Sequence, residues 1–206
     1  MPLDAFRPST RYERPAPLVR DDAVDVARVD RIRQGDQSAF EEVYREHYGA
    51  LVGFVYTYLR SEPLAEEEVQ DLFLAVWRHR TEWQPRTTLR AYLFKAARNR
   101  ALNRLRNQGV TTAVWEDAAA EGRTLAMGET PPALDQQVEA DELAEAARSA
   151  IARLAPRCRM AFVLCREEGL SYAETAEVMG ISEHTVKIQM GRALKALRIG
   201  LGHWLK

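Results

Sequence analysis

Apolar residues recur at intervals of three and four positions through most of the chain, a spacing that predicts helices and almost no strand. Between residues 38 and 59 the apolar positions of one helical face are Phe40, Tyr44, His47, Leu51, Val55 and Leu59. The pattern returns after Pro63 and again from about Thr88 to Arg106. Three helices of this kind can close one small bundle.

Residues at the ends of these segments favour the same helices. Ser38, with Glu41 three positions later, predicts a capping box at the start of the first helix. Pro63 suits the first turn of the second helix, where its missing N–H is tolerated. These local signals place helix starts close to the beginning of each apolar pattern.

Two stretches lack this periodicity. Residues 1–22 carry four prolines among charges, and from about Asn107 to Ala133 glycines and prolines interrupt an acidic stretch. We therefore expect an all-α fold in which two small helical domains are joined by a flexible acidic linker. The expected boundaries are a disordered tail at 1–27, a helical domain at 28–106, the linker at 107–135 and a second helical domain at 136–206.

The second half of the chain predicts a helix-turn-helix near its end. Ser171 and Glu174 form a second capping-box pattern, Gly180 allows a tight turn, and Ser182 can cap the last helix. The expected inward positions of the last two helices are Ala173, Ala176, Met179, Val186, Met190, Ala193, Leu194 and Leu197. A short helix, a glycine turn and a longer helix are typical of DNA-binding domains, although ordinary bundles also contain them.

The apolar face of the last helix determines which residues face outward. The outward set, with its capping residue, is Ser182, Glu183, His184, Thr185, Lys187, Ile188, Gly191, Arg192 and Lys195. In a helix-turn-helix these positions enter the major groove, where base edges and phosphates are read. We predict that this surface binds duplex DNA.

Charge is strongly segregated, although the formal net charge is only -1. The helix expected at 88–106 carries six basic residues and no acid, whereas nine acids and one base lie between Glu116 and Glu145. Tyr92 and Phe94 interleave the bases, a pattern that favours a surface for a nucleic-acid strand. The alternative is a structural helix with a solvated basic face and Trp83 in the core.

The chain offers no set of residues for catalysis. Its two cysteines, Cys158 and Cys165, form no metal-binding motif, and its four histidines are scattered. We expect two free thiols, no metal, no cofactor and no enzymatic activity. No apolar stretch is long enough to insert into a membrane, and we expect a cytoplasmic protein.

Several ordered motifs resemble one family. Residues 35–40, 65–73 with Trp77, and 96–99 with 105–106 resemble region 2 of extracytoplasmic-function sigma factors of the sigma-70 family. Residues 154–159, 169–176, 180–182, 185–187 and 192–194 resemble region 4 of the same factors. The resemblance covers roughly residues 30–106 and 136–200.

The resemblance implies a role for each segment. The helix that would bind core RNA polymerase contributes Glu68, Gln70, Asp71, Leu72, Phe73 and Trp77. The surface that would bind the -10 element comprises Trp83, Arg86, Arg90, Lys95, Arg98, Asn99 and Asn103. The last helix would read the -35 element of promoter DNA. An anti-sigma factor is a further expected partner, and an envelope or nutrient signal the expected trigger.

The resemblance also implies a mechanism. Free, the two domains are expected to pack together or to be masked by the inhibitory partner, and on polymerase they are splayed to reach both promoter elements. One alternative stays open at the level of the residues: a helix-turn-helix transcriptional regulator that does not bind polymerase core. An enzyme acting on nucleic acid would need a catalytic set of residues that the chain lacks, and the basic helices argue against a pure interaction protein.

Overall fold

A computed structural model describes residues 22–85, 87–109 and 138–202, and within these ranges the chain is helical with no strand. The first half contains α1 (Asp22–Arg33), α2 (Gln37–Leu59), α3 (Glu62–Arg78), a short 3-10 turn (Arg80–Glu82) and α4 (Leu89–Asn107). The second half contains α6 (Val138–Ala152), α7 (Pro156–Phe162) with a π-helical turn (Val163–Glu167), α8 (Tyr172–Met179) and α9 (Glu183–Gly200). The expected all-α fold is confirmed for these residues.

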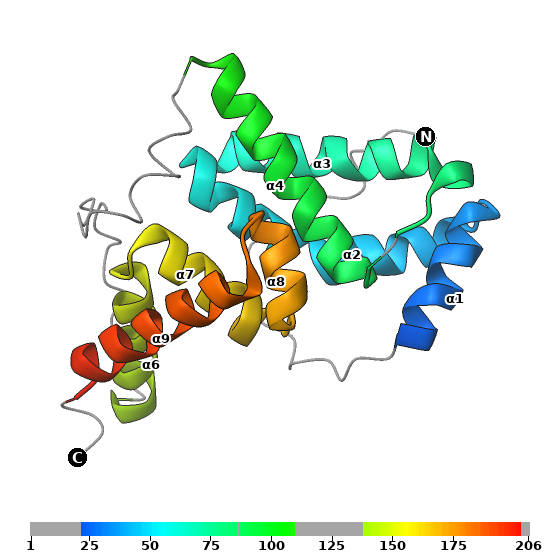
Figure 1. Ribbon diagram of the computed structural model, residues 1–206. Helices are drawn as coiled ribbons and strands as arrows, with labels where there is room; N and C mark the ends of the chain where they lie inside the picture. Colours follow the sequence, from blue (N-terminus) through cyan, green and yellow to red (C-terminus); the bar gives the residue numbers. More distant parts are fainter. Residues whose placement is uncertain (1–21, 86, 110–137, 203–206) are drawn as a thin grey trace.

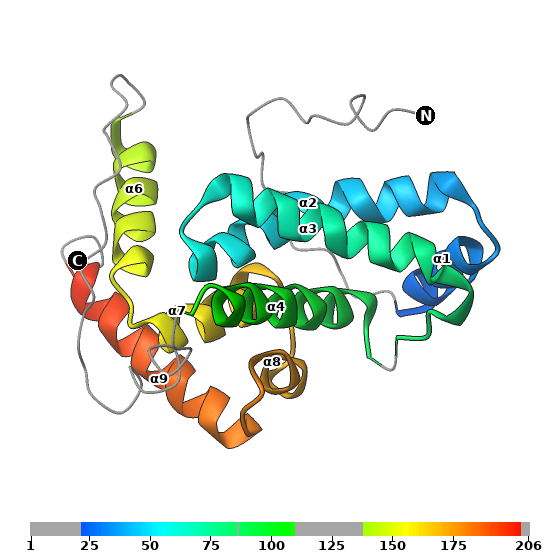
Figure 2. The same cartoon turned by 90° about the horizontal axis from the view of Figure 1, so that it is seen from above.

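Helices α2, α3 and α4 pack on one another and form a bundle, in which α4 crosses the other two obliquely in Figure 1, and α1 lies at one end (Figures 1 and 2). Aromatic rings fill its interior, since Phe54 contacts both Tyr58 and Phe94 edge to face. His47 is buried in the same bundle, and burial together with the nearby Arg90 and Arg28 lowers its pKa to about 3. His47 is therefore a neutral packing residue near neutral pH.

Helix α1 was not predicted from the sequence, which placed only a domain boundary at residue 28. Residues 22–27, which we assigned to the tail, form its first turns, and residues 1–21 lie outside the described part of the chain. The helix is held because Val29 and Ile32 are buried and Arg28 donates to Glu46 of α2 at 2.8 Å. Tertiary burial thus extends order past the boundary suggested by composition.

The start of α2 also differs from the prediction. Its N-cap is Asp36, whose carboxylate accepts from the N–H groups of Ser38 at 2.9 Å and Ala39 at 3.1 Å. Ser38 is no cap, because its hydroxyl donates to the same carboxylate. Hydrogen bonds from Ser38, Ala39 and Arg31 lower the pKa of Asp36 well below its usual range. The predicted capping box at Ser38 is therefore wrong.

The two halves of the chain pack against each other through α4 and α8 (Figures 1 and 2). One continuous cluster of buried residues runs from Leu51 and Phe94 in the first half to Leu164, Val178 and Met190 in the second. A smaller cluster of Leu154, Cys158, Ala193 and Leu197 holds α9 on α7. The structure therefore presents the halves in a closed arrangement.

Candidate functional site

The helix-turn-helix in α8 and α9 is built from local signals that the structure confirms. The hydroxyl of Ser171 accepts from the N–H of Glu174 at 3.2 Å, and the carboxylate of Glu174 accepts from the N–H of Ser171 at 2.8 Å, which completes the capping box. Gly180 has φ of 66°, a left-handed conformation that a residue with a side chain adopts only with strain. Ser182 caps α9 by accepting from the N–H of Thr185 at 3.1 Å. The turn and both caps thus set the direction of α9.

The outward face of α9 agrees with the prediction. Its exposed residues include Ser182, Glu183, His184, Lys187, Ile188, Gly191, Arg192 and Lys195, and Thr185 is half-buried. Lys187 Nζ lies 3.0 Å from Glu183 Oε1, so these neighbouring charges pair on the helix surface. The face carries a net positive charge and is open to a partner.

One inward position of α9 was assigned wrongly. Leu194 is 42% exposed, whereas Gln189 is buried. Gln189 is stable there because its Oε1 accepts a hydrogen bond from Cys158 Sγ at 3.0 Å, which satisfies the buried amide oxygen. Burial raises the pKa of the Cys158 thiol, which keeps it protonated as the donor. Helical periodicity alone does not reveal such a pair, because the two residues lie on different helices.

On α4 the residues predicted to bind the -10 element fall into two groups. Asn99 and Asn103 are exposed, and Asn103 accepts from Arg106 at 2.9 Å. Arg90, Lys95 and Arg98 instead lie on the side facing α8 and the segment just before it, where Arg90 meets Glu168. Trp83 is buried and contacts Tyr92 edge to face, so it supports the surface from below; Arg86 lies outside the described residues.

The basic residues at the other end of α4 meet acids of α3. Glu68 is 7% exposed, and its two carboxylate oxygens bind Arg100 at 3.1 Å and Arg104 at 3.2 Å. Arg104 also binds Glu67, and Arg100 binds Asp71. The helix that is purely basic in sequence is therefore partly neutralised by its neighbour.

The α3 residues predicted to bind polymerase do not all reach the surface. Leu72 and Phe73 are each 2% exposed and belong to the core, where Phe73 packs against Phe40 and Tyr44. Glu68 is committed to the two arginines. Gln70 and Asp71 are exposed. Trp77 is half-buried; its ring packs at a tilt against Phe40 and lies under the guanidinium of Arg80. Leu72 and Phe73 therefore hold α3 on the core and cannot contact a partner directly.

Sequence reasoning missed the residues that cover α4. Glu174 accepts from the hydroxyl of Thr88, Lys95 binds Glu177 at 2.7 Å, and Arg90 donates to the Glu168 carbonyl at 2.9 Å. The guanidinium of Arg98 lies beside the αL turn at Gly180. In the sequence Glu174 stands out only as part of the capping box with Ser171. Nothing there indicates that it also pairs with Thr88, which lies 86 positions earlier.

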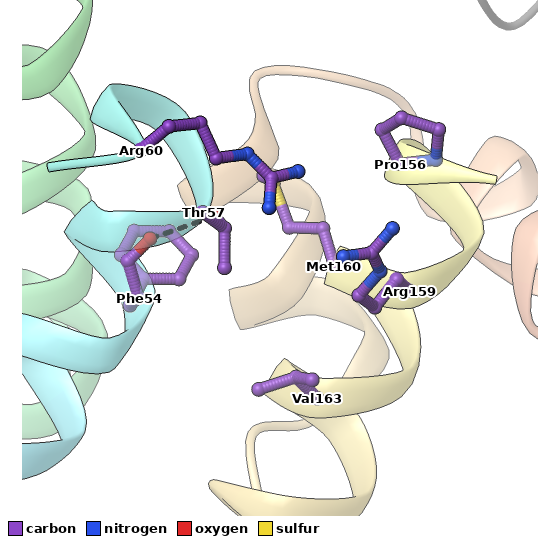
Figure 3. A pocket seen from close by; sticks show the side chains of 7 residues that line it. All are labelled: Phe54, Thr57, Arg60, Pro156, Arg159, Met160 and Val163. Carbon is purple, nitrogen blue, oxygen red and sulfur yellow. Dashed lines mark hydrogen bonds between the residues drawn. The ribbon is translucent and has the colours of Figure 1, made fainter. Parts of the chain in front are cut away.

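A shallow pocket lies at a second contact between the halves, where α2 meets α7 (Figure 3). It is lined by Phe54, Thr57, Arg60, Pro156, Arg159, Met160 and Val163. Burial and the charge of Arg60 lower the pKa of Arg159, and the Tyr58 hydroxyl donates to the sulfur of Met160 at 2.9 Å. The lining is mostly apolar and includes no acid, which fits a packing gap between two helices.

Residues 22–85, 87–109 and 138–202 contain neither a metal-binding cluster nor a membrane-spanning helix. No three acidic, cysteine or histidine side chains converge there in a way that could hold a metal ion. Nor does any helix in these ranges combine the length and apolar character that crossing a bilayer requires.

Two family models match the chain, one in each half. Residues 43–111 match Sigma-70 region 2, and residues 144–197 match Sigma-70, region 4. The RNA polymerase sigma factor CarQ of Myxococcus xanthus is 31% identical over 175 residues, which are 84% of this chain and 95% of that protein. The ECF RNA polymerase sigma factor SigM of Mycobacterium tuberculosis is 29% identical over 82% of this chain and 80% of its own length.

Two solved structures share the fold. The structure of CnrH in complex with the cytosolic domain of CnrY has a TM-score of 0.55 at 24% identity and covers 89% of this chain and 99% of its own. The sigma factor RpoE in complex with the anti-sigma factor NepR from Bartonella quintana has a TM-score of 0.55 at 23% identity, covering 79% and 96%. At these sequence identities the similarity shows only that the helices are arranged alike.

Proposed function

Because the chain belongs to the sigma-70 family of RNA polymerase sigma factors, in the extracytoplasmic-function group, we propose that it binds core RNA polymerase and directs it to promoters. One unit, at residues 28–106, binds polymerase and the -10 element, and a second, at 136–206, binds the -35 element. A linker at 107–135 joins them. The observation that carries this proposal is the exposed, capped helix α9 at the end of a helix-turn-helix, in a chain whose first half matches region 2.

The -35 element is read by α9 as duplex DNA. His184 and Lys187 lie in its first two turns and are exposed, where a recognition helix meets base edges. Ile188 and Gly191 offer an apolar, low-relief surface that suits a thymine methyl group. Arg192 and Lys195, one and two turns further along, hold phosphates and so fix the register of the helix on the duplex.

The -10 element is bound on α4. Asn99 and Asn103 can make hydrogen bonds to an unpaired base, because both amides are exposed on one face of the helix. Arg90, Lys95 and Arg98 supply charge for the strand, with Trp83 supporting the surface and Arg86 extending it. The side of α4 that carries these three cations becomes available when α8 leaves α4, whereas Asn99 and Asn103 are already exposed.

Polymerase binds the exposed part of α3. Gln70 and Asp71 lie on this surface and Trp77 contributes its exposed edge, while Leu72, Phe73 and Glu68 hold the helix rigid from behind. A rigid helix face with a few anchoring side chains is a common way to bind a partner helix. The protein acts by binding rather than by catalysis, in the cytoplasm where polymerase is found.

An anti-sigma factor is the proposed inhibitory partner. RpoE of Bartonella quintana, which shares the fold, was solved in complex with its anti-sigma factor NepR. The closed arrangement of α4 and α8 offers such a partner two halves that already lie together. An envelope or nutrient signal would then release the sigma factor.

A reconstituted transcription assay tests this function. Core RNA polymerase is incubated with genomic DNA fragments, with and without the purified protein, and transcript start sites are mapped. We expect start sites that appear only with the protein and share two spaced sequence elements. Specific DNA binding without any new start site would instead favour a helix-turn-helix regulator that does not engage polymerase.

A further inference from the structure

The inward face of α9 has a buried polar residue at one edge and an exposed apolar residue at the other. Gln189 is 4% exposed, whereas Leu194 is 42% exposed. Five positions separate them, which corresponds to about 140° around a helix. Burial of a leucine is favourable and burial of an amide is costly, so the hydrophobic effect alone favours a helix turned toward Leu194.

The observed rotation of α9 therefore differs from the one that its apolar pattern would select. The buried residues of the helix are Val186, Gln189, Met190, Ala193 and Leu197. If Leu194 took the place of Gln189 in this set, the centre of the inward face would move by about 30° around the helix axis. Such a rotation displaces the side chains at the helix surface by about 3 Å. A hydrogen bond to a base edge does not tolerate a displacement of that size.

A hydrogen bond from α7, which packs on α9, holds Gln189 inside (Figures 1 and 2). The Cys158 thiol donates from Sγ to Gln189 Oε1 at 3.0 Å and is itself 6% exposed. Cys158 belongs to the buried cluster that also contains Leu154, Ala193 and Leu197. An unsatisfied amide oxygen would be costly in these surroundings, so the bond offsets the unfavourable burial of Gln189.

We propose that Cys158 and Gln189 are positioning residues for promoter recognition, because their hydrogen bond fixes the rotation of α9 and thereby determines which bases of the -35 element it selects. This inference rests on the proposed function and deepens it, since it assigns sequence preference to a buried pair behind the recognition surface. A satisfied buried polar pair of this kind selects one packing arrangement among several that bury similar apolar area.

The rotation would exchange the places of two outward residues. At 100° per residue Gly191 lies nearer the middle of the present outward face than Arg192, and a turn of about 30° toward Leu194 would reverse that order. An arginine can bind guanine edges or phosphates, whereas a glycine offers no side chain for either. Base preference would therefore change when the hydrogen bond is lost, and not affinity alone.

The test removes the donor from the full-length protein. Cys158→Ala deletes the thiol, and Cys158→Ser keeps a donor at the same position and should retain the wild-type preference. Cys158→Ala with Gln189→Leu makes both residues apolar and should hold the same rotation without the bond. The matched control is Cys165→Ala, which removes a thiol 3.2 Å from the Thr175 hydroxyl of α8 and leaves the contact with α9 intact.

The probe is a labelled duplex with the -35 element of a promoter found by the transcription assay, compared with each single-base substitution of that element. Wild type should discriminate against wrong bases by about fivefold or more where α9 reads them. In Cys158→Ala we expect this ratio to fall by about threefold or more, or the preferred base to change, at one or more positions. In the serine variant, the double variant and the control, the ratios should stay within about twofold of wild type.

A second readout follows the rotation without DNA. In Cys158→Ala the methyl groups of Leu194 should be less accessible to a soluble paramagnetic agent than in wild type, because the helix turns to bury them. In the double variant they should stay as accessible as in wild type. If circular dichroism shows that Cys158→Ala loses its helices, Cys158→Val removes the donor while filling the space, and the same changes are expected of it.

Unchanged base ratios in the folded donor-free variant would overturn the inference, and unchanged accessibility of Leu194 would overturn the rotation on which it depends. A loss of affinity by the same factor for every duplex would also contradict it, since that is the effect of a purely structural role. If wild type discriminates among the duplexes in these cases, the proposed function stands and only the positioning role is lost. A wild-type protein that binds all duplexes alike and directs no specific transcription would instead count against the proposed function itself.

Discussion

The side chains of Thr88 and Glu174 join the first turns of two helices from opposite halves of the chain. Glu174 Oε1 accepts from the Thr88 hydroxyl at 2.5 Å, while its Oε2 accepts from Ser171, the N-cap of α8. Thr88 in turn caps α4 by accepting from the N–H of Ala91 at 3.3 Å. A single carboxylate therefore serves the cap of one helix and holds the cap residue of another, which ties closure of the halves to local helix structure.

Two glycine substitutions should have effects of opposite sign. Gly180→Ala should lower the free energy of unfolding by about 1 kcal/mol, because φ of 66° is strained for alanine. Gly53→Ala, in the middle of α2 with open space around its Cα, should raise it by about 0.5–1 kcal/mol. Urea denaturation measures both, and a stabilising Gly180→Ala would contradict the αL assignment of the turn.

Phe73→Ala should destabilise the first bundle strongly. The ring is 2% exposed and contacts Phe40 and Tyr44, so its removal should lower the free energy of unfolding by about 3–5 kcal/mol. Asp71→Ala, on the exposed face of the same helix, should cost less than about 1 kcal/mol despite its pair with Arg100. Similar midpoints for the two variants in chemical denaturation would mean that Phe73 is not a core residue.

The exposed part of α3 can therefore be tested for polymerase binding without unfolding the chain. Gln70→Ala with Asp71→Ala should reduce co-purification with core polymerase and leave the thermal midpoint close to wild type. Glu62→Ala, at the exposed start of the same helix, is the matched control and should co-purify normally. Full retention of polymerase by the double variant would move the binding surface away from this part of α3.

Arg192→Ala should weaken binding of duplex -35 DNA and lower its dependence on salt. If Arg192 holds one phosphate, the slope of log affinity against log salt should decrease by about one. Arg148→Ala, which removes an exposed arginine from α6, should leave the slope unchanged. The measurement is a titration series at several salt concentrations, and an unchanged slope for Arg192→Ala would remove it from the interface.

His47 should make stability depend on pH below neutrality. Burial, with Arg90 and Arg28 nearby, lowers its folded-state pKa from 6.5 to about 3, so the unfolded chain binds more protons between these values. Its contribution is fully present above pH 6.5 and is lost as the pH falls toward 3. Between neutral pH and about 5.5 the free energy of unfolding should fall by about 1.2 kcal/mol, and it should fall less in His47→Gln. Parallel pH profiles for the two proteins would contradict the buried neutral state.

Much of the fold could be read from sequence because it depends on neighbours along the chain. The capping box of Ser171 and Glu174, the αL turn at Gly180 and the outward face of α9 all follow from residues a few positions apart. The capping box predicted at Ser38 was wrong because the carboxylate of Asp36, a stronger acceptor two positions earlier, takes the free N–H groups at the start of α2. Helix α1 was missed because burial of Val29 and Ile32 by the bundle, rather than its own composition, holds that helix.

The sequence by itself thus determined where most of the helices lie, that the second half contains a helix-turn-helix, and which family the chain belongs to. Only the tertiary structure decided which side chains are available. Helical periodicity orients a residue on its own helix and says nothing of the helix that covers it, so Phe73 could not be distinguished from a surface anchor. The cations of α4 looked unopposed for the same reason: Glu68 and Glu177, which oppose them, are brought there from other helices by folding.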